Sequence, residues 1–127
     1  MRVRPASHRI GFARLAILVV SAAGASACAY ETIDQHACPT GGTQLTYDNF
    51  GRQFMNDYCQ SCHGSMSVNR QGAPGDFIFD TPAQIQHWRS RIYVRSASTN
   101  DSMPPGPADP PLDVRNQLAD WLACGAP

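Results

Sequence analysis

Two cysteines and a histidine form the motif that constrains this chain most. Cys59, Cys62 and His63 lie in the run CQSCH, with two residues between the thiols and the imidazole directly after the second thiol. This is the C-x-x-C-H pattern of covalent c-type haem attachment. Thiols on adjacent turns of a short helical segment can each attack one vinyl group of a haem, and the next residue then turns its ring toward the iron. The motif predicts one covalent haem c, with Cys59 and Cys62 as thioethers and His63 as the proximal iron ligand.

A bare C-x-x-C pair also occurs as a redox dithiol, as half of a zinc site, or as a structural disulfide. A redox dithiol is expected beside a βαβ pattern, and we find none in the sequence. A zinc site needs a second pair of ligands at close spacing, and Cys28, Cys38 and Cys124 are too scattered to supply one. The histidine after the second cysteine therefore favours haem.

Residues 1–27 have the composition of an export signal. Four arginines and no acidic residue precede Glu31, and a short apolar run over 15–20 leads into small residues that end at Cys28. The apolar run is too short for a stable membrane-spanning helix. The stretch 25–28, ASAC, is similar to the lipid-attachment site of bacterial lipoproteins, with ordinary cleavage near Ala27 as the alternative. We expect an exported protein at the periplasmic face, anchored to the membrane if Cys28 is lipidated.

The charge balance after cleavage disfavours nucleic acid as a partner. Six arginines, no lysine and ten acidic residues follow position 27, so six positive and ten negative charges leave a net charge of −4. An acidic surface repels phosphate backbones and anionic lipid. It predicts redox partner proteins with basic docking patches. The remaining 100 residues are enough for one domain. A domain of this size has a small core, so a large apolar cofactor would add substantially to it.

Two cysteines remain after haem attachment and lipidation. Cys38 lies just before the first predicted helix and Cys124 just after the last, and an exported protein meets an oxidising compartment. We expect a Cys38–Cys124 disulfide.

Residues 28–45 are polar and rich in turn-forming residues, which predicts a tether and lead-in in which His36 is solvated.

Thr46 can cap a helix that runs to about Tyr58. Gly51 interrupts its apolar face, so it is either tolerated or lets another helix approach closely. Residues 64–80 read as a loop in which the apolar stretch 77–79 covers the cofactor.

A second helix is expected from Thr81, as its cap, to about Ser96. Its inward side is predicted to hold Ile85, Trp88, Ile92 and either Tyr93 or Val94. We expect the arginines of this helix to face solvent mostly, although one of them, or the Trp88 indole, could hydrogen-bond a haem propionate. His87 is expected to be a half-exposed helix residue rather than a ligand.

Five prolines make residues 97–111 irregular. Met103 lies in this polar loop before Pro104 and Pro105, where it has no helical core to fill, and we expect its thioether to be the distal iron ligand. The alternative is an exposed loop methionine. A last helix is predicted from about Asp109 to about Ala123, with Leu112, Leu118, Trp121 and Leu122 inward and Asp120 outward.

Taken together, residues 46–124 resemble a small class I cytochrome c domain. The likeness rests on a helix that runs into C-x-x-C-H, a later Met-Pro-Pro loop and a C-terminal helix. It implies an all-α fold of three to four helices around a covalently attached haem, with long loops, over residues 46–127. It also implies His63 and Met103 as iron ligands, and a first helix that crosses the last closely at Gly51.

The implied function is that of a monohaem one-electron carrier rather than an enzyme. Two features depart from the family: the chain has no lysine for docking, and the family's N-terminal aromatic position falls on Met55. A peroxidase-like haem enzyme with an open or non-methionine axial site is the main alternative. A sensor, an electron-accepting subunit of a larger enzyme, and a haem-free disulfide-stapled domain are the others.

Overall fold

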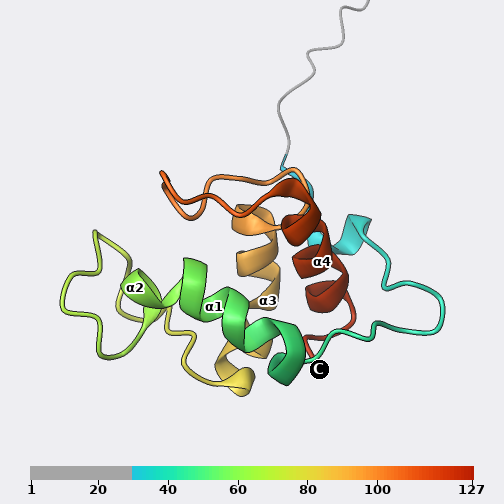
Figure 1. Cartoon of the computed structure of the whole chain (residues 1–127), viewed down its shortest axis with the longest axis horizontal. Coiled ribbons are helices and arrows are strands. Elements are labelled where there is room, and N and C mark those ends of the chain that lie inside the picture. The colour runs from blue at the N-terminus through green and yellow to red at the C-terminus, as the bar shows by residue number, and fades with distance from the viewer. Residues whose placement is uncertain (1–29) are drawn as a thin grey trace, which may run out of the picture.

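The computed structural model describes residues 30–127, which form helices joined by long loops and contain no strand. In chain order the elements are the 3-10 turn η1 (Ile33–Gln35), the π-helical turn η2 (Tyr47–Gly51), and the helices α1 (Arg52–Tyr58), α2 (Gln60–His63), α3 (Pro82–Ser96) and α4 (Leu112–Ala123) (Figure 1). The all-α prediction is confirmed for this part of the chain. The expected export signal and Cys28 lie outside it.

The first helical segment begins at the predicted cap. The Thr46 hydroxyl accepts a hydrogen bond from the Asn49 backbone N–H (3.2 Å), and the Asn49 side chain accepts one from the Thr46 N–H (2.7 Å). The amide of Gly51 donates to the Thr46 carbonyl, five residues back, which gives η2 its wide turn. The chain then continues as α1 to Tyr58, where we expect the helix to end.

Helix α3 has the predicted bounds. The Thr81 hydroxyl accepts from the Gln84 backbone N–H, the Gln84 side chain accepts from the Thr81 N–H, and Pro82 opens the helix. These reciprocal bonds satisfy amides that the first helical turn leaves unpaired. Ile85 and Ile92 are buried as predicted.

Helix α4 begins at Leu112, three residues later than expected. Pro110 and Pro111 precede it, and a residue before proline is driven toward extended backbone, so residues 109 and 110 do not join the helix and Pro111 is its N-cap. Leu112 is 52% exposed, so its predicted inward placement is wrong. At 3.6 residues per turn it lies about a third of a turn away from the buried Leu118.

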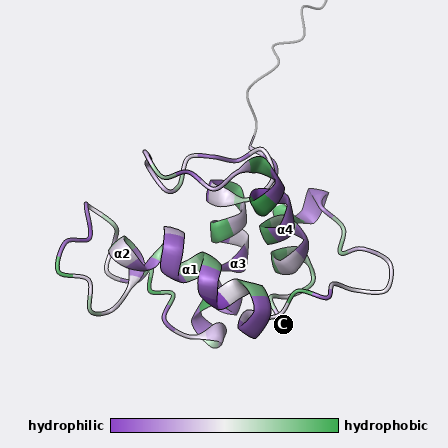
Figure 2. Ribbon diagram, in the orientation of Figure 1, coloured by the Kyte–Doolittle hydropathy of each residue, from purple (hydrophilic) through white to green (hydrophobic). Residues whose placement is uncertain are grey.

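The core lies between α3, α4 and the first helical segment. Six large side chains are fully buried, and burying each stabilises the fold by roughly 1.5–3 kcal/mol; they are Met55, Ile85, Tyr93, Leu118, Trp121 and Leu122. Hydrophobic and hydrophilic residues alternate along α3 and α4 (Figure 2). The expected close approach of the first and last helical segments is present, because Gly51 lies against the Trp121 ring.

None of the helices within residues 30–127 is both long and apolar enough to cross a membrane.

Candidate functional site

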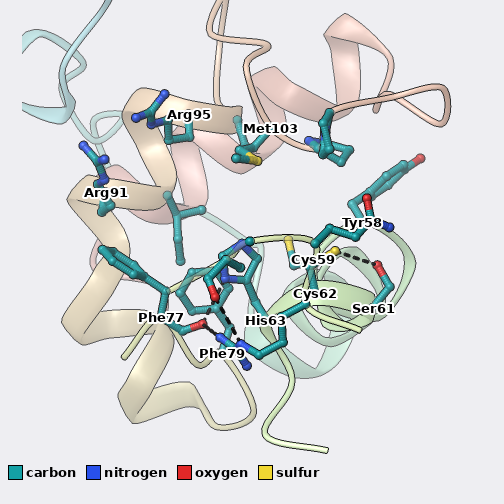
Figure 3. Close-up of a pocket in the computed structure, with 18 of the residues that line it drawn as sticks. Tyr58, Cys59, Ser61, Cys62, His63, Phe77, Phe79, Arg91, Arg95 and Met103 are labelled. Carbon is teal, nitrogen blue, oxygen red and sulfur yellow. Dashed lines mark hydrogen bonds between the residues drawn. The ribbon is translucent and has the colours of Figure 1, made fainter. Parts of the chain in front are cut away.

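The three residues of the C-x-x-C-H motif lie on one helical turn. Cys59 ends α1, and its carbonyl accepts hydrogen bonds from the amides of Cys62 (3.1 Å) and His63 (2.8 Å). Because these bonds wind the chain tightly, all three side chains reach the same cavity (Figure 3).

That cavity has a volume of about 430 Å³. Its walls come from α1, α2, the loop over 64–80, the C-terminal part of α3 and the proline-rich loop. The apolar lining includes Phe77, Phe79 and Ile92. His63 lies on one side of the cavity and Met103 on the other (Figure 3).

The hydrogen bond of His63 fixes which ring nitrogen is free. Its Nδ1 lies 2.9 Å from the carbonyl oxygen of Phe77. A carbonyl can only accept, so the proton is on Nδ1, and in the neutral tautomer the lone pair is then on Nε2. The ring also stacks on Phe79, with centroids 4.5 Å apart and planes 17° apart. An imidazole oriented in this way is typical of a metal ligand.

The loop that supplies this carbonyl is held by Arg70. Its guanidinium donates to the carbonyls of Gly64 (3.0 Å), Ala73 (3.3 Å), Pro74 (2.8 Å) and Phe77 (3.2 Å). The sequence does not predict this role, because an arginine in a polar loop gives no local signal of the carbonyls to which it donates.

The Cys59 thiol is buried. Burial, with a smaller contribution from Cys62, raises the pKa of Cys59 to about 12. Redox dithiols instead carry a thiol whose pKa is lowered by nearby positive charge or a helix N-terminus. Cys38 and Cys124 are bonded to each other, so neither can complete a zinc site with the pair.

Met103 is held at the cavity by its backbone. Its amide donates to the carbonyl of Arg95, at a distance of 2.9 Å, which ties the proline-rich loop to the end of α3. Pro104 and Pro105 line the cavity beside it, and 38% of Met103 is exposed. The methionine that the sequence singles out is therefore brought to the same cavity as His63.

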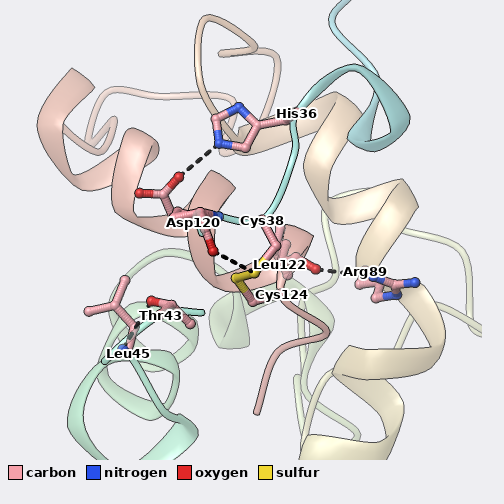
Figure 4. The surroundings of a disulfide bond; sticks show 9 residues. His36, Cys38, Thr43, Leu45, Arg89, Asp120, Leu122 and Cys124 are labelled. Carbon is pink, nitrogen blue, oxygen red and sulfur yellow. Dashed lines mark hydrogen bonds and ion pairs between the residues drawn. A yellow bond between two sulfur atoms is a disulfide. The ribbon is translucent and has the colours of Figure 1, made fainter. Parts of the chain in front are cut away.

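The expected pairing of Cys38 with Cys124 is present, with the sulfur atoms 1.96 Å apart (Figure 4). It joins the lead-in to the residue that follows α4. The two cysteines do not line the cavity that holds Cys59 and Cys62.

His36 is not the solvated residue that we expect from the sequence. Its Nε2 lies 2.8 Å from Asp120, its Nδ1 lies 3.3 Å from Glu31, and only 26% of its side chain is exposed (Figure 4). The disulfide holds the lead-in against α4, which brings Asp120, one turn before Cys124, within reach. His87 is exposed on α3 and does not line the cavity, as expected.

Arg91 is exposed, as expected for the arginines of α3, whereas Arg95 is less exposed than expected. Both line the cavity, and Arg95 is half-buried. Arg89 has another role, since it donates to the carbonyl of Leu122 on α4 (3.2 Å).

Within residues 30–127, no three or more histidine, cysteine, aspartate or glutamate side chains are grouped as a metal site. Comparison with protein-family models, with curated proteins and with solved structures finds no match to this chain.

Proposed function

We propose that this chain is a c-type haem-binding domain, with Cys59 and Cys62 as the thioether residues and His63 as the proximal iron ligand. The observation that carries the proposal is the tautomer of His63. Its Nδ1–H is donated to the Phe77 carbonyl, which leaves Nε2 for a ligand, and His63 lines one cavity together with both cysteines. The donor set and the apolar walls fit a haem.

Within that class we propose a small class I cytochrome c-like electron carrier with Met103 as the distal ligand. This proposal is supported by the loop that ties Met103 to the cavity from the side opposite His63. The chemistry that such a haem supplies when bound is the gain of one electron by ferric iron and its later loss to an acceptor.

The residues of the chain tune and protect this centre. A thioether ligand favours reduced iron relative to a second imidazole. Phe77, Phe79 and Ile92 give the cavity apolar walls, and an apolar environment disfavours the additional positive charge of ferric iron. We therefore propose a relatively positive midpoint potential.

We further propose that the protein is exported and works at the periplasmic face, through a lipid anchor if Cys28 is modified. Its acidic balance suits partners with basic docking patches. Association with such partners then slows as salt rises, because surface charges are screened.

The test is to co-express the chain with a cytochrome c maturation system and ask whether haem stays bound after denaturation. The wild type retains haem through two thioethers, Cys59→Ser and Cys62→Ser each lose one, and the double variant retains none. The matched control is Cys38→Ser with Cys124→Ser, which removes two cysteines outside the cavity and leaves haem attached. A wild type free of covalent haem overturns the proposal.

A further inference from the structure

We propose that Arg91 and Arg95 form a carboxylate-binding site for the two haem propionates, an inference that rests on the proposed function. The two arginines are four residues apart on α3, so they lie on one face of the helix, and both line the cavity.

Neither guanidinium has a carboxylate partner in the part of the chain that the structure describes. The ion pairs among residues 30–127 involve His36 and Arg52 instead. Arg95 makes one long contact with the Ser102 hydroxyl (3.5 Å), and Arg91 lies over the Phe77 ring at 6.0 Å. The guanidinium groups of Arg91 and Arg95 at this cavity are therefore free to bind an anion.

The other arginines of this region are already occupied. Arg70 donates to four loop carbonyls, Arg89 to the Leu122 carbonyl, and Arg115 to the carbonyls of Ser98 and Pro110. Arg91 and Arg95 are distinguished by lining the cavity without such partners. This contrast separates them from charged side chains that hold loops or helix ends together.

The position of the two arginines agrees with the way a haem must enter. A haem carries its vinyl groups on one edge and its propionates on the opposite edge. Cys59 and Cys62 lie on one side of the cavity, and Arg91 and Arg95 lie on the other (Figure 3). Attachment of the vinyl edge to the thiols therefore directs the propionate edge toward the arginines.

The chemistry of the pair matches two carboxylates. A guanidinium is always charged, and its planar fork binds a carboxylate through parallel hydrogen bonds. The two positive charges of Arg91 and Arg95 would balance the two negative charges of the propionates. Because an unbalanced propionate stabilises ferric iron, the arginines raise the midpoint potential.

The test compares Arg91→Gln and Arg95→Gln in the haem-loaded protein at one pH. Each variant should have a lower midpoint potential than the wild type, and the propionate bending vibration in the resonance Raman spectrum should shift. Arg91→Lys and Arg95→Lys keep the charge and should restore most of the potential, but not the vibration, because lysine lacks the fork. Arg52→Gln, which removes the same charge from an exposed pair with Asp48, is the matched control.

Two results would overturn the inference. One is a potential in both glutamine variants that is no lower than in the Arg52→Gln control. The other is a lowered potential with an unchanged propionate vibration, which would mean that the arginines act on the iron only at a distance. Covalent haem in the wild type is measured first, so failure of the proposed function is seen separately.

Discussion

Gly51 lies so close to the indole of Trp121 that position 51 has no room for a side chain. A Cβ built on Gly51 would be 2.4 Å from both Cη2 and Cζ2 of the indole. Trp121 is fully buried, and Phe50 meets its ring edge-on with centroids 5.8 Å apart. The indole therefore has no room to move away from position 51. The close crossing of η2 and α4 depends on glycine, which has no side chain, at that position.

Overpacking a core usually costs about 1–3 kcal/mol, so Gly51→Ala should lower the free energy of unfolding by up to about 2 kcal/mol after the helix-propensity gain of alanine is subtracted. The backbone of Gly51 is helical, so alanine gains about 1 kcal/mol in helix propensity, and only the clash can make the change destabilising. Thermal unfolding measures the result, at roughly 4–8 °C for each kcal/mol in a domain of this size. Gly75→Ala is the control, since a Cβ there meets nothing within 4 Å. Equal stabilities for the two variants would contradict the packing.

The Cys38–Cys124 disulfide closes a loop over a sequence separation of 86 residues. Loop entropy credits such a bond with roughly 4–5 kcal/mol at most. Cys38→Ser with Cys124→Ser should therefore unfold at a lower urea concentration than the wild type. Reductant should shift the wild type toward the variant and leave the variant unchanged. A transition in the wild type that does not respond to reductant would count against the bond.

His36 should stabilise the fold most at acidic to neutral pH. Its hydrogen bond to Asp120 raises its pKa above the ordinary 6.5, burial opposes this, and Glu31 adds to it. A group whose pKa is raised by folding contributes its full stabilisation below about pH 6.5 and loses it as pH rises through the folded-state pKa. Since the pairs are partly solvated, the contribution is about 1 kcal/mol or less.

The measurement is the free energy of unfolding of the wild type and His36→Gln from about pH 5 to about pH 8. The difference between them should be largest at the acidic end and shrink toward the alkaline end. His87→Gln is the control, because His87 is exposed on α3. If the difference in the free energy of unfolding grew with pH, the ion pairs of His36 with Asp120 and Glu31 would be contradicted.

Met103→His should lower the midpoint potential of the haem-loaded protein. A second imidazole stabilises ferric iron relative to a thioether, so the variant is harder to reduce. Potentiometric titration followed by absorption gives the result. Met66→His is the matched control, since Met66 is 88% exposed and does not line the cavity. A potential that Met103→His leaves unchanged would show that Met103 is not a ligand.

Much of the fold is predictable because its signals are local. Thr46 and Thr81 cap their helices through bonds to residues three positions later, and the start of α3 follows from Thr81-Pro82. The burial of Trp121 follows from helical periodicity. The sequence predicts the start of α4 too early, because a proline is compatible with the first turn of a helix, whereas here both prolines precede it.

The rest depends on contacts between distant parts of the chain. His36 and Asp120 are 84 residues apart, so no local pattern reveals their pairing. The same holds for the Phe77 carbonyl, which selects the tautomer of His63 but carries no side-chain signal. Helical periodicity places Arg91 and Arg95 on the polar side of α3. It cannot predict that both of them line a cavity, because the other walls of that cavity come from distant parts of the chain.

The most direct test of the central proposal is the absorption spectrum of the chain matured with haem, in the oxidised and reduced states and before and after denaturation. We expect haem that survives denaturation, together with a weak far-red or near-infrared methionine-to-iron band in the oxidised native protein. That band should disappear in Met103→His. Covalent haem without the band, with rapid carbon monoxide binding by the reduced protein, would contradict the electron carrier and favour an open-site enzyme. Absence of covalent haem would contradict the haem site itself.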